Sequence, residues 1–165
     1  AYFEFDTSPG HVDGATLLAD FPNLLVLRTF SKAYGLAGLR CGYGLTSSYL
    51  AAAIRKVATP FGLSAVAEAC ALEALADNAA MLSQVSQICK ERERVLSELR
   101  NLGWTIPQAG GNFIWFGAPV GEQVQAAALS QGVQTRGLPE GVRVTIGSRA
   151  ENDQFLAAIS SIKPR

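Results

Sequence analysis

Arg28-Thr29-Phe30-Ser31-Lys32-Ala33-Tyr34-Gly35-Leu36-Ala37-Gly38-Leu39-Arg40 is the stretch that decides the fold of this sequence and the place of its chemistry. It follows residues 24–27, a continuous apolar run that is typical of a strand buried on both faces, as in a parallel sheet. Proteins built from such strands place their ligands where the strands end. The order therefore predicts an α/β fold with a ligand site in residues 28–40.

The side chains around Lys32 suit a ligand that carries a phosphate. Hydroxyls at Thr29 and Ser31 and the guanidinium of Arg40 offer directional, charge-assisted hydrogen bonds to phosphate oxygens. An amine held among such groups, away from water, is an effective nucleophile. A phosphate and a nucleophilic amine together indicate pyridoxal phosphate, which carries a phosphate and an aldehyde. The alternatives are a solvated surface lysine or a loop for another phosphate, although neither the P-loop nor the G-x-G-x-x-G pattern is present.

Residues 29–40 closely resemble the cofactor-lysine signature of class-II pyridoxal-phosphate aminotransferases, and most of all the histidinol-phosphate and aromatic amino acid (phenylalanine) aminotransferase group. Residues 1–2 resemble the end of that group's Asp-Glu-Ala-Tyr motif, and residues 142–147 resemble its substrate-arginine strand. The lysine motif is highly specific, and the other two support it. The resemblance covers nearly the whole chain.

The resemblance implies an α/β architecture of fold type I, which is the fold of aspartate aminotransferase. Residues 1–80 would form the C-terminal part of the large cofactor-binding domain with a connecting helix. Residues 81–165 would form a long helix and a small C-terminal α/β domain. Members of this group act as homodimers, so a homodimer is expected here.

The resemblance also implies the roles of the cofactor residues. Lys32 would form a Schiff base with pyridoxal phosphate and then move a proton between the substrate Cα and the cofactor C4′. Tyr2 would donate a hydrogen bond to the phenolic oxygen of the cofactor. The cofactor phosphate would be bound by Thr29, Ser31 and Arg40.

Two arginines are the expected substrate residues. Residues 142, 144 and 146 are apolar and share one face of a strand, so Arg143 points to the other face. The resemblance implies that Arg143 clamps the substrate α-carboxylate and that Arg136 reads a second anionic group. The alternative for Arg143 is an ordinary surface arginine.

The implied reaction transfers the amino group of an aromatic amino acid to 2-oxoglutarate. Histidinol-phosphate aminotransferase is the close alternative. Two rivals stay open: another fold-type-I enzyme such as an acyl-CoA-condensing synthase, which Arg143 disfavours, and a folded module without activity of its own.

Parts of the family pattern lie outside this sequence. The aspartate that pairs with the pyridinium nitrogen should stand just before Ala1, and the N-terminal half should supply a ring-stacking residue and much of the dimer surface. We therefore expect a C-terminal half that is inactive by itself and that needs the N-terminal half as its partner.

Composition excludes several classes of function. Hydrophobic residues make up 48% of the 165 residues and charged residues 17%, which excludes a disordered chain. The 14 basic and 14 acidic residues balance, so neither nucleic acid nor a membrane surface is an expected partner. Cys41, Cys70 and Cys89 are widely spaced and His11 is the only histidine, so no metal site is expected. Reduced, buried thiols in a cytoplasmic protein and a solvated loop histidine are the expectations.

The remaining pattern predicts alternating strands and helices. Strands are expected at residues 2–5, 41–45, 112–116, 133–135 and 142–146. Helices are expected at residues 64–82, 82–102 and 122–131, and after residue 148. Residues that should begin or end these helices are Ser64, Gly103 and Gly132, with Ser148 and Glu151 as a capping box. The first helix carries acidic residues and should be a core helix, not a membrane span, and the charged run 90–94 should be a solvated helix face.

Overall fold

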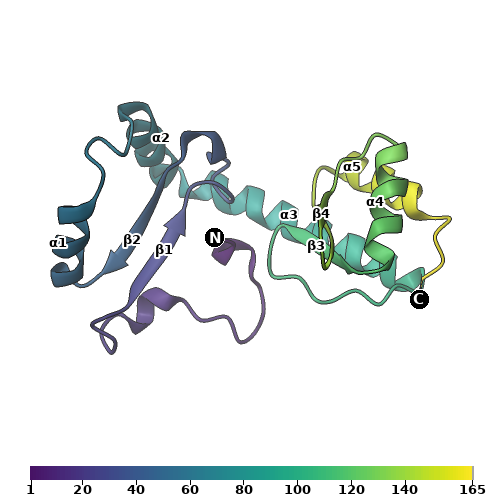
Figure 1. Cartoon of the computed structure of the whole chain (residues 1–165), viewed down its shortest axis with the longest axis horizontal. Coiled ribbons are helices and arrows are strands. Elements are labelled where there is room, and N and C mark those ends of the chain that lie inside the picture. The colour runs from purple at the N-terminus through teal and green to yellow at the C-terminus, as the bar shows by residue number, and fades with distance from the viewer. Residues whose placement is uncertain (165) are drawn as a thin grey trace. The chain divides into compact units, whose positions relative to one another are not determined.

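The chain divides into two compact units, Ala1–Gln84 and Val85–Arg165, which are described one at a time (Figure 1). The computed structural model describes residues 1–164. Assigning the two units to a large and a small domain, with a boundary at residue 80, stays a prediction. Among the described residues, no helix is long and apolar enough to cross a membrane.

The first unit contains a two-stranded sheet and two helices. Strand β1 (Leu25–Thr29) pairs antiparallel with β2 (Gly42–Thr46), and α1 (Ser48–Val57) and α2 (Ala65–Ala76) follow. Short 3₁₀ turns occupy Phe3–Phe5, Gly14–Leu17 and Ala37–Leu39.

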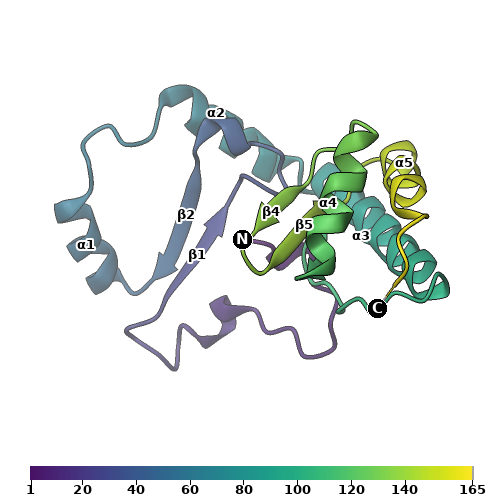
Figure 2. The same cartoon turned by 45° about the vertical axis from the view of Figure 1, so that its right-hand side comes forward.

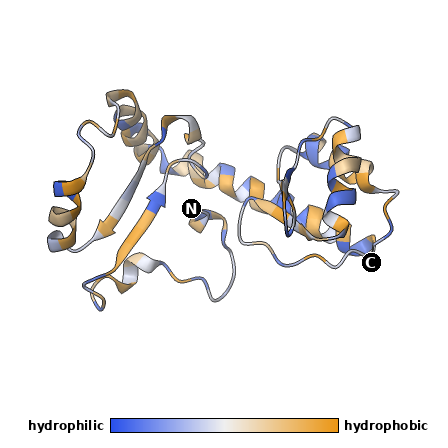
Figure 3. Ribbon diagram, viewed as in Figure 1, coloured by the Kyte–Doolittle hydropathy of each residue, from blue (hydrophilic) through white to orange (hydrophobic). Residues whose placement is uncertain are grey.

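Two predictions about strands in this unit are wrong: the strand at residues 2–5, and the parallel, fully buried setting of β1. Residues 2–5 were expected to form a strand, but Phe3–Phe5 is a 3₁₀ turn in which the Asp6 N–H donates to the carbonyl of Phe3. Strand β1 forms as predicted but lies antiparallel to β2, and Leu25 and Leu27 on one of its faces are 41% and 70% exposed. Figure 3 shows the first part of this strand as hydrophobic and its end as hydrophilic. An apolar run indicates that a strand tends to be buried, but it does not determine which strand pairs with it or in which direction.

The helices of the first unit begin at capped residues. The Ser64 hydroxyl accepts from the N–H of Ala67, as predicted, and the Ser47 hydroxyl does the same at α1, which the sequence pattern missed. The apolar stretch 64–82 does not form one core helix: α2 ends at Ala76, and the Asp77 carboxylate accepts from Ala80 at the start of α3 (Asn78–Asn101). Several of its apolar side chains are exposed, so only one side of α2 is core.

The second unit is a three-stranded antiparallel sheet covered by helices on one face. Its strand order is β3–β5–β4, formed by Phe113–Gly117, Gly141–Thr145 and Arg136–Leu138. The covering helices are the C-terminal part of α3, α4 (Val120–Ser130) and α5 (Arg149–Ile159), all on one side of the sheet in Figure 2. The core joins Leu96 and Leu99 of α3 to Ile114, Phe116 and Phe155. The opposite face of the sheet is left without a helix of this unit.

Most helix ends of this unit are confirmed. Gly103 and Gly132 have φ of +89° and +77°, the left-handed conformation that favours glycine after a helix. Ser148 and Glu151 form the full capping box. Residues 133–135 are not a strand, because β4 begins only at Arg136.

The charged run 90–94 was expected to be solvated, and this is wrong for Arg92. Its side chain is 1% exposed, and its Nη1 donates to the carbonyl of Gly111 at 2.9 Å. Glu91 and Arg94 are also partly covered, because α5 packs beside them and Asp153 pairs with Arg94 at 2.7 Å. This part of α3 therefore contacts both the loop before β3, through Arg92, and the start of α5, through Arg94.

Candidate active site

The loop that carries Lys32 is fixed from its apolar side. Phe30 and Cys41 are buried and pack with Ala67 and Ala71 of α2. The loop closes through the N–H of Leu36, which donates to Phe30 at 2.9 Å, and the N–H of Gly35, which donates to Lys32 at 3.0 Å. Because the loop's apolar side chains face α2, Ser31 and Lys32 are left half-buried and available to a ligand.

The structure brings Lys32 and Tyr2 together. The Lys32 Nζ lies 5.8 Å from the centroid of the Tyr2 ring, within the range of a cation–π contact. These residues are 30 positions apart, and the sequence had placed both at the cofactor. An amine and a phenol are therefore adjacent beside the loop.

The predicted phosphate residues begin and end the same loop. The hydroxyl of Thr29 accepts from the N–H of Ser31 at 3.1 Å, so these two are adjacent. Arg40 has φ of +54°, and its Nη1 donates to the Ala37 carbonyl at 2.6 Å. The N–H of Phe30 donates to Cys41 at 3.2 Å and so joins the two ends of the loop. Two hydroxyls, a guanidinium, an amine and a phenol are a donor set that fits a ligand with a phosphate, an aldehyde and a phenolic oxygen.

The predicted substrate arginines are direct neighbours in the second unit. Arg136 of β4 and Arg143 of β5 are partners in the strand register, so both side chains lie on the face that the helices leave open. The Arg143 guanidinium carbon is 5.2 Å from the centroid of the Phe113 ring. In the described part of the chain, the Nε of Arg143 is buried and has no hydrogen-bond partner. The structure therefore brings the two predicted substrate arginines together on one sheet face.

Two aromatic residues on this open face were missed by the sequence reasoning. The ring of Phe113 lies beside the Arg143 guanidinium, and Trp115 on β3 is the register partner of Arg143. A Cβ at Gly141 would clash with the carbonyl oxygen of Phe116 and lie 2.8 Å from Cζ2 of Trp115, so the backbone of β3 and the Trp115 ring both require a glycine there. The alternation of residues 113–117 is the signal that could have found them, since Ile114 and Phe116 point to the core.

His11 was expected to be a solvated loop residue, but it is half-buried. Its Nδ1 lies 3.0 Å from the Asp6 carboxylate, and its side chain is 25% exposed. Hydrogen bonds from Ser8, and then from His11, lower the pKa of the Asp6 carboxyl. The His11 ring also lies against the ring of Phe3, with 4.6 Å between the ring centroids.

The thiols do not form a site. Cys41 is buried, Cys70 and Cys89 are half-buried, and within residues 1–164 none of the three forms a disulfide. Burial raises the pKa of the Cys89 thiol. No group of three or more metal-binding side chains occurs within residues 1–164.

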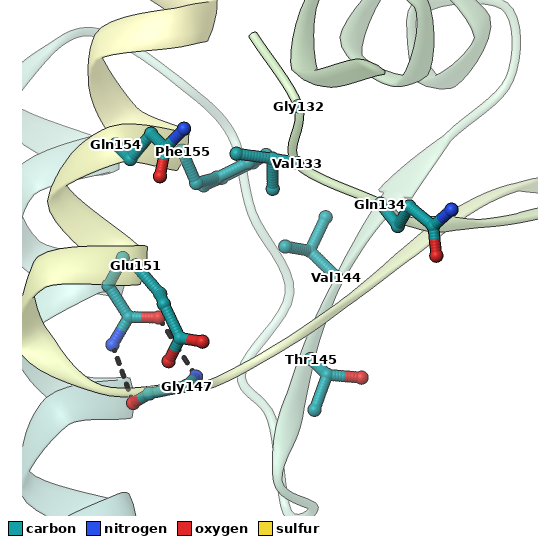
Figure 4. A pocket seen from close by; sticks show the side chains of 10 residues that line it. Gly132, Val133, Gln134, Val144, Thr145, Gly147, Glu151, Gln154 and Phe155 are labelled. Atoms are coloured by element: carbon teal, nitrogen blue, oxygen red, sulfur yellow. Dashed lines mark hydrogen bonds between the residues drawn. The ribbon is translucent and has the colours of Figure 1, made fainter.

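The second unit also contains a pocket of about 340 Å³ between residues 132–134 and α5 (Figure 4). Gly147 and Asn152 exchange two hydrogen bonds of 3.0 Å at its wall. The pocket lies where residues 133–135 diverge from β5 and do not continue β4. None of the predicted site residues lines it, so it is separate from the candidate active site.

Comparison with known proteins identifies the class of this chain. The family model described as aminotransferase class I and II matches residues 1–159. The chain therefore belongs to the class I and II aminotransferase family.

Several curated relatives carry the name aromatic amino acid aminotransferase. The chain is 46% identical over 160 residues to the one from Streptomyces avermitilis, with 94% of this chain and 44% of the relative covered. It is 41% identical over 162 residues to the one from Cutibacterium acnes, with 97% and 46% covered. The chain thus spans a little under half the length of these relatives.

Solved structures agree on the fold. Histidinol-phosphate aminotransferase from Sinorhizobium meliloti, solved with pyridoxal-5′-phosphate, matches with a TM-score of 0.84 and 30% identity over 97% of this chain and 46% of that chain. Aspartate aminotransferase from Thermotoga maritima matches with a TM-score of 0.75 over 97% of this chain and 45% of that chain, at 21% identity that speaks for the fold alone. The predicted α/β architecture of fold type I is confirmed.

Proposed function

We propose that this protein is a pyridoxal-phosphate-dependent aminotransferase and that Lys32 holds the cofactor covalently through its amine. The observation that carries the proposal is the contact between Lys32 and Tyr2 beside a loop of hydroxyl and guanidinium donors. Family membership and the relative solved with pyridoxal phosphate support it. When bound, the cofactor supplies an electron sink for the bonds at the substrate Cα.

The residues of the first unit then have distinct tasks. Tyr2 donates a hydrogen bond to the phenolic oxygen of the cofactor and favours its ionised form. Thr29, Ser31 and Arg40 bind the phosphate and so fix the cofactor's orientation. Lys32 would act as the general base and acid that moves the proton at the substrate Cα.

The residues of the second unit recognise the substrate. Arg143, oriented by the ring of Phe113, binds the α-carboxylate that every amino acid and oxo acid carries. Arg136, its register partner, binds a second anionic group of the substrate.

We propose aromatic amino acids as donors and 2-oxoglutarate as acceptor, because the relatives at 41–46% identity are named aromatic amino acid aminotransferases. The second carboxylate of 2-oxoglutarate is an anion of the kind that Arg136 suits. The alternative is histidinol phosphate, which is favoured by the solved relative at 30% identity. In that case Arg136 would bind a phosphate.

We also propose that the 165-residue chain has no transaminase activity by itself. The relatives are more than twice as long as the part that matches, so residues corresponding to their N-terminal region would complete the site. A homodimer is the proposed assembly. A cytoplasmic location is proposed because the three cysteines form no disulfide within residues 1–164, and cytosolic cysteines are kept reduced.

Borohydride trapping tests the proposal. A fusion that places the N-terminal region of the Streptomyces avermitilis relative before Ala1 gives a chain of the relatives' length. Reduction in the presence of pyridoxal phosphate should fix the cofactor on the peptide with Lys32, and Lys32→Ala should remove the label and the turnover. Label on Lys56, on Lys90 or on the added region would contradict the assignment.

The same fusion tests the reaction. It should transaminate phenylalanine or tyrosine with 2-oxoglutarate, while the 165-residue chain alone should not. Preference for histidinol phosphate would support the alternative, and a product formed only with an acyl-CoA would indicate the condensing synthases instead.

A further inference from the structure

A single arginine connects the segment that bears Tyr2 to the loop that bears Lys32. The guanidinium carbon of Arg28 lies 3.4 Å from the centroid of the Phe3 ring, close enough for direct stacking. Phe3 is the neighbour of Tyr2, and Arg28 is the last residue before Thr29 at the start of the loop. The stack therefore joins two segments that lie 25 positions apart in the sequence.

The guanidinium is held in place by a carboxylate. Arg28 Nη2 pairs with the Asp13 Oδ1, and the Arg28 side chain is 9% exposed. Asp13 in turn accepts from the N–H of Ala15 at 2.8 Å, which fixes the carboxylate on its own 3₁₀ turn. A planar cation that is mostly buried and paired has little freedom to leave the ring it covers.

Phe3 has a second aromatic neighbour that is also anchored. The ring centroids of Phe3 and His11 are 4.6 Å apart, and His11 Nδ1 lies 3.0 Å from Asp6. The N–H of His11 donates to the carbonyl of Ser8, and the N–H of Ser8 donates to Asp6. Segment 3–11 is thereby folded back on itself around Phe3.

We propose that Arg28 is a positioning residue for the cofactor site: by stacking on Phe3, with His11 as support, it sets the distance between Tyr2 and Lys32. This inference rests on the proposed function for its purpose, because Tyr2 and Lys32 are the residues proposed to hold the cofactor. Arg28 would itself contact neither substrate nor cofactor. It acts through the placement of its neighbours.

The test reads the Tyr2–Lys32 contact itself and needs no cofactor. Reductive methylation with ¹³C-formaldehyde labels the lysine amines of the 165-residue chain and keeps their charge. The dimethyl-lysine NMR signal of Lys32, assigned with Lys32→Arg, should be displaced by the ring current of Tyr2. Tyr2→Leu should move this signal toward that of the exposed Lys56.

Arg28→Lys is the decisive variant. Lysine keeps the charge beside Asp13 but loses the planar face that stacks on Phe3. The Lys32 signal should lose most of its displacement, and Arg28→Lys combined with Tyr2→Leu should add nothing to Tyr2→Leu alone. Arg55→Lys, an exposed arginine of α1 in the same unit, is the matched control and should leave the signal in place.

An unchanged Lys32 signal in folded Arg28→Lys protein would overturn the proposal. If that variant fails to fold, Phe3→Leu takes its place, since it keeps apolar bulk and removes the ring under the guanidinium. An unchanged signal there has the same meaning. Failure of borohydride to label Lys32 would refute the proposed function but leave this NMR result standing, so the two failures are distinguishable.

Discussion

Arg136 and Arg143 stand opposite each other on β4 and β5, on the face of the sheet that no helix of their unit covers. Like charges directly opposite across two strands destabilise a sheet by roughly 0.2–1 kcal/mol. An anion bound between the two guanidiniums removes that cost. The pair is therefore better suited to a liganded state than to the free protein.

Arg143→Ala should impair both halves of the reaction, because donor and acceptor share the α-carboxylate. Losing one partner of a buried charged pair costs roughly 3–5 kcal/mol, or about 150- to 5,000-fold in affinity. Arg143→Lys should rescue only part of this, because it keeps the charge without the planar fork. Steady-state kcat/KM for phenylalanine and for 2-oxoglutarate in the fusion measures the effect.

Cofactor attachment at Lys32 provides the control for this variant and should be unaffected. An effect on one substrate alone would show that Arg143 binds the side chain of that substrate and not the shared α-carboxylate. The carboxylate clamp would then be Arg136.

Arg136→Gln should separate substrates by their charge. Removing one guanidinium from a second anionic group loses a charge-assisted hydrogen bond of about 1.5–3 kcal/mol, so KM for 2-oxoglutarate should rise roughly tenfold or more. Phenylalanine has no second anion, and its KM should stay nearly constant. Arg55→Gln is a matched control on an exposed helix. Equal effects on both substrates would contradict this role.

The same variant should also stabilise the protein slightly. With the like-charge neighbour of Arg143 gone, the free energy of unfolding should rise by up to about 1 kcal/mol. Urea unfolding of the 165-residue chain measures it. A loss of stability would show that the two arginines do not repel each other in the free protein.

The sequence predicted the local chemistry of the fold better than its pairings. The capping box at Ser148 and the turn glycine Gly103 depend on neighbours within a few positions, so their pattern is sufficient. The pairing of β1 depends on distant segments, and its apolar run could not distinguish an antiparallel partner from a parallel one. The error at residues 133–135 has another cause: the tight turn at residues 139–140 fixes which residues of β4 oppose β5, but the chain before Arg136 diverges from β5, so no strand forms there.

In the candidate site, too, the features that depend on nearby residues could be predicted and those that depend on distant residues could not. Lys32, Thr29 and Ser31 lie in one short stretch and could be found from it. The neighbouring positions of Arg136 and Arg143 depend on the strand register, and the stacking of Phe113 depends on side-chain direction across two strands. The burial of Arg92 could not be predicted either, because the loop carbonyl it reaches belongs to Gly111, 19 positions away.

Arg92→Met should destabilise the second unit although it replaces a charged residue by an apolar one. Methionine fills much of the volume, but the Gly111 carbonyl loses its donor, and an unsatisfied buried acceptor costs about 1–3 kcal/mol. Urea unfolding of the 165-residue chain should show this loss. Lys90→Met, an exposed residue of the same run, should change stability by no more than about 0.5 kcal/mol. Equal effects of the two variants would mean that the Arg92 hydrogen bond contributes nothing.

The stability of the second unit should fall as the medium is acidified, with Glu91 as one cause. Hydrogen bonds from Arg94, and then from Asn152, lower the pKa of Glu91 below its ordinary value of 4.5. A carboxyl whose pKa is lower in the folded state stabilises the fold above its unfolded pKa. That contribution is lost as the pH falls through 4.5 toward the lower folded pKa.

Glu91→Gln tests this contribution directly. The variant should be less stable than the wild type at pH 7, by about 1 kcal/mol for a partly exposed pair, and the difference should shrink as the pH falls below 4.5 toward pH 3. Urea midpoints measured between these two pH values give the comparison. Glu98→Gln on the exposed side of α3 is the matched control and should follow the wild-type curve. If Glu91→Gln also runs parallel to the wild type across the whole range, the carboxylate of Glu91 does not link α3 to α5 through its charge.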